Sequence, residues 1–92
     1  MEEKKQLLYL INGLINNTYD IKTFCEEFTR IYDLDLDYDT LDKQEESILG
    51  EICIMSARFS SNPEELKIPN MYYSEEQIRN VVKQALKELS KT

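Results

Sequence analysis

The chain has 92 residues, of which 41% are hydrophobic and 32% charged. This composition is typical of a globular protein and is too apolar for a disordered one. A chain of this length forms one domain with a small core, so we expect a single domain over residues 1–92. Histidine, the usual general base and the commonest metal ligand, is absent, which argues against an enzyme.

The net charge of −7 comes from one segment. Residues 33–51, here called the acidic segment, hold eight acids and one base, Lys43, whereas the rest of the chain holds ten acids and ten bases. A negative field concentrated in one place repels nucleic acid and membrane surfaces and attracts a basic protein. The alternative is a solvated face that only keeps the protein soluble.

The ends of the chain and its cysteines indicate a cytoplasmic protein. The first six residues are polar, the apolar patch at residues 7–11 follows acids, and no apolar run approaches the roughly 20 residues of a membrane span. We therefore expect neither a signal peptide nor a membrane partner. Cys25 and Cys53 each lie in an apolar helical pattern, so we expect two reduced cysteines in the core.

Apolar residues at helical spacing predict a first helix over residues 2–16 and a second over residues 20–33, with Asp20 as its N-cap. Phe24 and Phe28, four residues apart, are expected to stack on the core face of the second helix. The apolar stripes of these two helices are Leu7, Leu8, Ile11, Leu14 and Ile15, then Ile21, Phe24, Cys25, Phe28, Ile31 and Tyr32.

Residues 33–39 alternate acids with apolar residues, a pattern typical of a strand. Four like charges on one face and the lack of a partner strand make an isolated strand implausible. We expect instead an extended connection in which Leu34 and Leu36 turn inward and the acids face water or a partner.

The same acids have the spacing of a calcium loop. Counted from Asp35, Glu46 is at the twelfth position, where such loops carry their bidentate ligand. The sixth position, which needs glycine for a sharp turn, is Thr40, and the eighth, usually apolar, is Asp42. These departures argue against a calcium site.

A third helix is expected to begin at a cap formed by Thr40 or Asp39 and to end near Phe59. Gly50 in this helix and Gly13 in the first each cost about 1 kcal/mol relative to alanine, so both predict close approach by a neighbouring element. The stripe of the third helix is Leu41, Glu45, Ile48, Ile52, Met55 and Phe59.

Two start signals follow. Asn62 and Pro63 suit the cap and first position of a short helical turn, which Pro69 ends. Residues 74–77 form a capping box that begins the last helix, with Tyr73 available for a hydrophobic staple. Four amphipathic helices with short connections predict an all-α fold, an antiparallel four-helix bundle with a short extra helical turn between helices 3 and 4.

Residues that support catalysis or cofactor binding are scarce. Two separated cysteines cannot form a zinc site, and a cysteine nucleophile lacks an activating base. Adjacent glutamates on a helix point apart, and the chain has no glycine-rich phosphate loop. We therefore predict no catalytic residue, no cofactor and no metal.

The order of these features resembles a known family. Phe24 and Phe28 are followed by an acidic joint, the sequence GEICIMSARF at residues 50–59, a corner with proline and acids, a tyrosine, and Ile78-Arg79. This order resembles the colicin D immunity protein family, the bacterial self-protective colicin-like immunity proteins, which include immunity proteins of contact-dependent growth inhibition. The resemblance covers most of the chain and is densest over residues 50–79.

The resemblance implies a function. Such proteins are four-helix bundles that bind a cognate nuclease toxin, often a tRNase, and cover its basic active cleft with acidic side chains in place of RNA phosphate. Family members tend to carry acids directly after the Arg-Phe pair, whereas here Ser60, Ser61 and Asn62 follow. This departure implies a toxin unlike the nuclease of colicin D, or a contact that the acids of residues 37–46 take over.

We therefore expect a monomeric immunity protein whose partner is a basic nuclease toxin domain. The alternative is an acidic helical adaptor or regulatory module with a non-toxin partner. A third possibility, an immunity protein against membrane-active bacteriocins, is disfavoured because such a protein is expected to be basic. The residues expected to bind the partner are acids and polar residues of the hinge and corner plus one aromatic anchor: Asp35, Asp37, Asp39, Asp42, Glu46, Asn62, Glu64, Glu65 and Tyr72.

Overall fold

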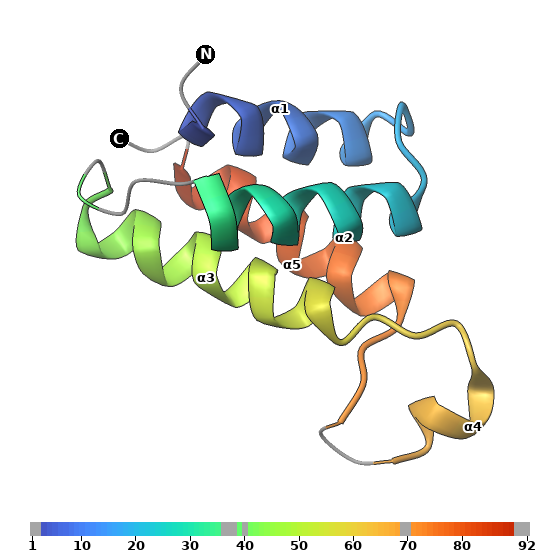
Figure 1. The fold of residues 1–92 in the computed structure, drawn as a ribbon. Helices are drawn as coiled ribbons and strands as arrows, with labels where there is room; N and C mark the ends of the chain where they lie inside the picture. The colour runs from blue at the N-terminus through green and yellow to red at the C-terminus, as the bar shows by residue number, and fades with distance from the viewer. Residues whose placement is uncertain (1–2, 36–38, 40, 69–70, 90–92) are drawn as a thin grey trace.

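The residues that the structure describes form four long helices and two short ones (Figure 1). The computed structural model describes residues 3–35, 39, 41–68 and 71–89. Within them, the only strand-like pairing is an isolated parallel bridge between Phe59 and Tyr73, so the all-α prediction is confirmed for this part of the chain. The elements are α1 (Glu3–Ile15), α2 (Ile21–Arg30), the π-helical turn η1 (Ile31–Asp35), α3 (Lys43–Ala57), α4 (Pro63–Leu66) and α5 (Glu75–Leu89).

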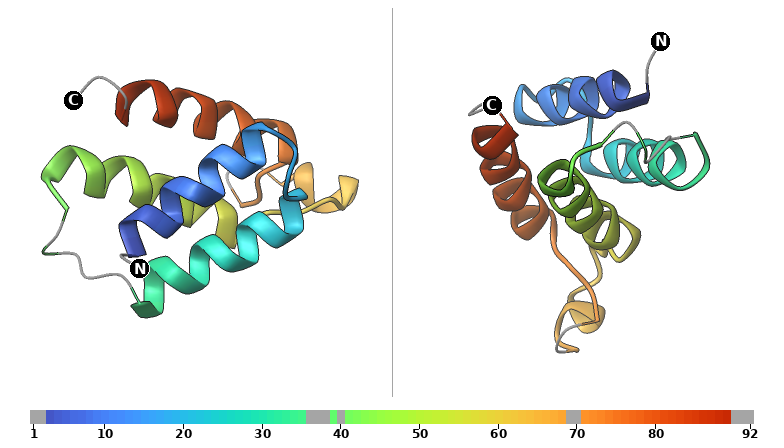
Figure 2. Two further views of the ribbon diagram at one scale, coloured as in Figure 1. Left: turned by 90° about the horizontal axis from the view of Figure 1, so that it is seen from above. Right: turned by 90° about the vertical axis from the view of Figure 1, so that its left-hand side faces the viewer.

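The long helices pack in a closed order around one core. Helix α1 contacts α2 and α5, α2 contacts α3, and α3 contacts α5. Figure 2 shows these four helices grouped together, whereas α4 lies outside the group, beyond the end of α3. The connection through α4 returns the chain to the start of α5, so that the predicted extra turn between the last two long helices is confirmed.

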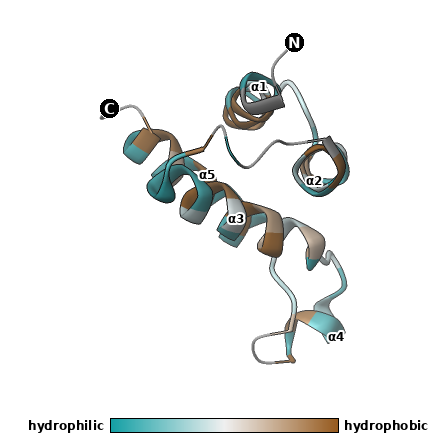
Figure 3. Cartoon of the chain, turned by 60° about the vertical axis from the view of Figure 1, so that its left-hand side comes forward, coloured by the Kyte–Doolittle hydropathy of each residue, from teal (hydrophilic) through white to brown (hydrophobic). Residues whose placement is uncertain are grey.

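Apolar faces of all four long helices meet in the core. Figure 3 shows the hydrophobic and hydrophilic sides of these helices. Phe24 and Phe28 are fully buried, with ring centroids 5.3 Å apart, as their spacing predicted. The buried residues are Leu7, Leu10, Ile11, Leu14, Ile21, Phe24, Cys25, Phe28, Ile31, Leu49, Ile52, Cys53, Met55, Ile78, Val82 and Ala85.

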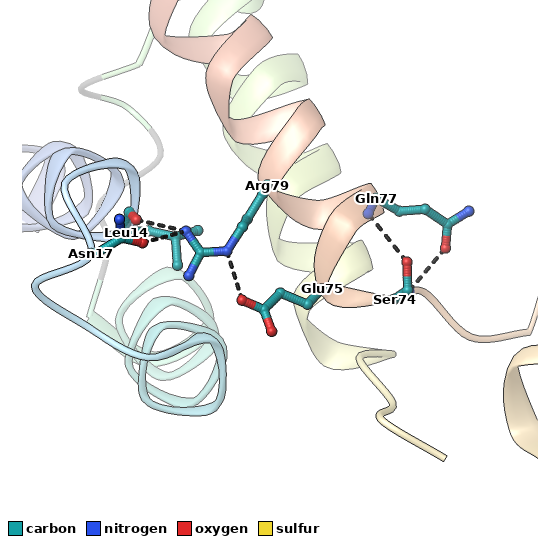
Figure 4. A network of polar contacts seen from close by, with 6 residues as sticks. All are labelled: Leu14, Asn17, Ser74, Glu75, Gln77 and Arg79. Atoms are coloured by element: carbon teal, nitrogen blue, oxygen red, sulfur yellow. Dashed lines mark hydrogen bonds and ion pairs between the residues drawn. The ribbon is translucent and has the colours of Figure 1, made fainter. Parts of the chain in front are cut away.

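Three predicted N-caps are confirmed. The Asp20 carboxylate accepts a hydrogen bond of 2.7 Å from the backbone N–H of Thr23, and this bond holds the pKa of Asp20 below its ordinary value. The Asn62 side chain accepts from the backbone of α4 at 2.9 Å. Ser74 and Gln77 form the reciprocal capping box, with bonds of 3.2 and 2.9 Å (Figure 4).

The predicted cap of the third helix was wrong. Asp42, not Thr40 or Asp39, begins α3, because Asp42 and Glu45 form a capping box that satisfies two backbone N–H groups. The Asp42 carboxylate accepts from the N–H of Glu45 at 2.7 Å, and the Glu45 carboxylate accepts from the N–H of Asp42 at 3.0 Å. Thr40 lies outside the described residues.

The connection after α2 also differs from the prediction. The predicted helix to residue 33 is confirmed, but Leu34 and Asp35 are not extended, because residues 31–35 form the π-helical turn η1 after α2. This path buries Ile31 and leaves the Leu34 side chain 78% exposed, so the expected inward turn of Leu34 was wrong. Leu36 lies outside the described residues.

Both glycines lie under a tyrosine ring. A Cβ atom added to Gly13 would clash with the ring of Tyr19, in the turn after α1. A Cβ atom added to Gly50 would lie 3.0 Å from the hydroxyl oxygen of Tyr32, in η1. The predicted close approach is therefore confirmed, but the neighbours are side chains rather than crossing helices.

Arg79 of α5 binds the end of α1 (Figure 4). Its Nη1 donates to the carbonyl oxygen of Leu14 at 2.9 Å and to Oδ1 of Asn17 at 3.3 Å, while its Nε donates to Glu75 at 2.7 Å. The last carbonyl groups of a helix have no partner within the helix. Arg79 is such a partner for the carbonyl group of Leu14, 65 residues away in the sequence, and so links the first and last helices.

Candidate functional site

The acidic segment runs from η1 to the middle of α3. Asp37 lies outside the described residues, and Asp35 is the last residue of η1. Glu45 is half-buried in the capping box. The acids of the segment whose side chains are exposed are Asp33, Asp39, Asp42, Glu46 and Glu51.

Asp42 has a structural role besides its charge. We expect Asp42→Ala to lower the free energy of unfolding by about 1 kcal/mol, because the N-cap acceptor of α3 is lost. Asp42→Asn keeps an acceptor of equal capping strength and removes the charge, so it is expected to leave stability nearly unchanged. Urea denaturation of the three proteins measures this difference, and equal stability of the alanine and asparagine variants would contradict the capping role.

A groove of about 680 Å³ runs along the outer face of α3. Successive residues of an α-helix are rotated by about 100°, so Ser47, Gly50 and Ile54 fall on one outward stripe. These three residues form the midline of the groove, here called the α3 groove. Ser47 is exposed, and Ile54 is 59% exposed although it is a large apolar residue.

The walls of the α3 groove come from the neighbouring elements. Tyr32 of η1 lies on one side, with its ring stacked on buried Phe28 at a centroid distance of 6.5 Å. Val81 of α5 and Tyr73, just before that helix, lie on the other side. Because Phe28 is buried in the core, its stacking on Tyr32 fixes the position of the Tyr32 ring beside Gly50.

Carboxylates flank the midline of the groove. Glu46 lies on one flank, and Glu51 lies on the other, where it faces Val81 of α5. Neither carboxylate has a hydrogen-bond or ion-pair partner in the part of the chain that the structure describes. Lys43, the one base of the acidic segment, lies at the N-terminal end of the groove.

The corner after α3 holds the other predicted partner-binding residues. Asn62 is engaged as the cap of α4, and Glu64 forms an ion pair of 3.6 Å with Lys67. Both side chains of that pair are highly exposed, so it contributes little to stability. The half-buried Glu65 accepts a hydrogen bond of 2.6 Å from the Ser60 hydroxyl, which orients its carboxylate.

Backbone bonds hold this corner to the start of α5. The N–H of Tyr73 donates to the carbonyl oxygen of Arg58 at 2.9 Å, and the N–H of Ser60 donates to the carbonyl oxygen of Tyr73 at 3.0 Å. Tyr73 packs against the core, whereas Tyr72 is half-buried and lies outside the core cluster. Of the two tyrosines, Tyr72 is thus the one less engaged in the fold.

A second recess, of about 520 Å³, lies between α2 and this corner. It is lined in part by Cys25, Ser56, Ser60 and Glu65. Burial raises the pKa of the Cys25 thiol to about 11, and the nearby Ser56 hydroxyl only partly opposes this rise. The Ser56 hydroxyl itself is buried without a hydrogen-bond partner among the described residues.

The second cysteine is also a protonated thiol. Burial raises the pKa of Cys53 to about 11, and the Asp33 carboxylate, 3.7 Å from its sulfur, adds to the rise. A thiolate is the nucleophilic form of cysteine, so thiols with such pKa values are unreactive at neutral pH. Cys25 and Cys53 are buried and free, as predicted from their positions in the helical pattern.

No group of three acidic or cysteine side chains within the described ranges is placed to hold a metal ion. No helix in the described part of the chain is long and apolar enough to cross a membrane. Comparisons with protein-family models, curated proteins and solved structures gave no match.

Three of the predicted residues line these two surfaces. Glu46 lies in the α3 groove, whereas Asn62 and Glu65 line the recess at the corner. Sequence reasoning did not select Ile54 or Glu51 as site residues. Ile54 could have been found as an apolar residue outside the core stripe of α3, whereas the walls of the groove come from distant parts of the chain.

Proposed function

We propose that this protein is an immunity-type inhibitor that binds a basic nuclease toxin domain and covers the toxin's RNA-binding cleft with its acidic surface. The observation that carries the proposal is the concentration of the whole net charge of −7 in residues 33–51, where five acids have exposed side chains. The proposed toxin is a tRNase and the proposed site of action is the cytoplasm. The inhibitor has no catalytic step of its own.

The proposed architecture is an antiparallel four-helix bundle that serves as a rigid support. The closed order of contacts among α1, α2, α3 and α5 supports this arrangement, as do the alternating directions of successive long helices (Figure 1). The hydrogen bond from Arg79 to the carbonyl oxygen of Leu14 joins the last long helix to the end of the first. A rigid support matters because side chains held in place lose less entropy on binding.

The proposed mechanism is electrostatic complementarity. A nuclease binds RNA phosphates through basic side chains, and those same side chains attract a concentrated set of carboxylates. Fields of this kind accelerate the encounter of two proteins, and salt weakens the acceleration. With its cleft covered, the toxin cannot bind its RNA substrate.

Co-purification tests the proposal. The chain is expressed together with the toxin domain encoded beside its gene, and one partner is captured by a tag. We expect a 1:1 complex that protects cells from the toxin and whose association slows as salt rises. The absence of a complex at low salt, or a complex with a non-toxin protein encoded at that position, would overturn the proposal and favour the adaptor function.

A further inference from the structure

The midline of the α3 groove holds one exposed apolar residue, Ile54, on an otherwise acidic surface. Ile54 is 59% exposed, and the two residues before it on the same outward stripe, Gly50 and Ser47, are small. The Tyr32 hydroxyl fills the place of a side chain at Gly50, 3.0 Å from where its Cβ atom would lie, and so forms one wall of the groove. Together these residues leave room for one bulky side chain from outside the molecule.

The charges around this midline are placed on both sides of it. Glu46 and Glu51 are five residues apart, which separates their backbone positions by about 7.5 Å along the helix axis. Both carboxylates are exposed and lack a partner among the described residues. Carboxylates in this position attract cationic groups to both edges of the groove.

We infer that the α3 groove binds a basic segment of the partner that carries one bulky apolar side chain. The apolar side chain rests on Ile54, and lysine or arginine side chains on either side of it pair with Glu46 and Glu51. This inference rests on the proposed function, and it names the part of the inhibitor that holds the toxin. A buried apolar anchor surrounded by charged pairs is typical of the residues that dominate binding energy.

The charge of the groove excludes other occupants. A second copy of the chain would bring another acidic segment of net charge −7 against the first, and like charges repel. Nucleic acid is repelled for the same reason. Lys43 at one end of the groove opposes a basic occupant, so the inference also predicts that its removal strengthens binding.

The first test uses peptides and does not need the toxin. One peptide has lysines on both sides of a central phenylalanine, and its charge-matched control has glycine at that position. We expect the phenylalanine peptide to shift the amide NMR signals of Ser47, Gly50 and Ile54 and to bind about tenfold more tightly than the control. Equal affinities, or shifts at the α4 corner instead, would overturn the inference.

The second test uses variants of the full chain with the toxin domain from the co-purification. Ile54→Arg is expected to weaken the complex by about 30-fold or more, whereas Thr23→Arg, an equal charge change at an exposed position of α2, is expected to have a much smaller effect. Lys43→Glu is expected to strengthen it. Thermal melting of each variant verifies that the fold is kept.

The outcomes separate the two proposals. If the toxin binds wild type and Ile54→Arg equally well, the groove inference is overturned and the proposed function stands. If no toxin binds but the peptides differ as expected, the proposed function fails and the groove is a site for another basic partner.

Discussion

Replacing Phe28 by alanine is expected to lower the free energy of unfolding by about 3–5 kcal/mol. The ring is fully buried, lies 5.3 Å from Phe24 and stacks on Tyr32 at 6.5 Å, so its removal leaves a cavity where α2 meets the rest of the core. Domains are stable by only about 5–15 kcal/mol, so this single change removes a large part of the total. Urea denaturation monitored by circular dichroism measures the loss.

Two controls distinguish burial from the general effect of losing a ring. Tyr9 is 61% exposed and pairs edge-to-face with Tyr19, so Tyr9→Ala is expected to cost about 1 kcal/mol or less. Phe28→Leu keeps most of the buried apolar volume and is expected to cost less than Phe28→Ala. If Phe28→Ala and Tyr9→Ala cost the same, the placement of Phe28 in the core is wrong.

Phe28 also illustrates what sequence reasoning could predict about the fold. Its helical spacing from Phe24 assigned both rings to one face of α2, because a 3.6-residue period is a local property of the chain. The caps at Asp20, Asn62 and Ser74 were predictable for the same reason, since a cap and the backbone N–H that donates to it lie within three residues.

The features that sequence reasoning missed depend on a choice between alternative local structures or on contacts between residues far apart in the sequence. Three residues near the start of α3 were able to cap it, and Asp42 is the cap because Glu45 three residues later returns a second bond. The helical path of Leu34 and Asp35 was missed because the alternation of acids and apolar residues there indicates an extended segment. The bond between Arg79 and Leu14 joins residues 65 positions apart, and no local pattern indicates it.

The candidate site shows the same division. Exposure of Asp33, Asp39 and Glu46 was predictable, because a dense set of like charges is stable only in water. The α3 groove was not, since it requires Tyr32 beside Gly50 and a wall from α5. The position of the acidic segment could thus be predicted from the sequence, whereas the α3 groove beside it could be found only in the structure.

Charge reversal on the flanks of the groove is expected to have the largest effect on binding. Each reversal changes the charge by two, so Glu46→Lys with Glu51→Lys changes the acidic segment from −7 to −3. We expect the association rate constant with the toxin domain to fall by about 10–100-fold at low salt, because electrostatic steering is lost. Stopped-flow measurements over a range of ionic strengths record the change, and the difference from wild type should shrink as salt screens both proteins.

A matched pair of reversals separates local from total charge. Glu26→Lys with Glu76→Lys makes the same change in net charge. The positions also match, because Glu76, like Glu46, lies in the first turn of its helix, and Glu26, like Glu51, is an exposed acid further along a helix. If steering depends on net charge alone, the two double variants slow association equally, and the acidic segment has no special role. If the local field matters, the control keeps most of the wild-type rate at 0.1 M salt, because Glu26 and Glu76 lie outside the acidic segment and an exposed charge acts only over about 10 Å at that salt concentration.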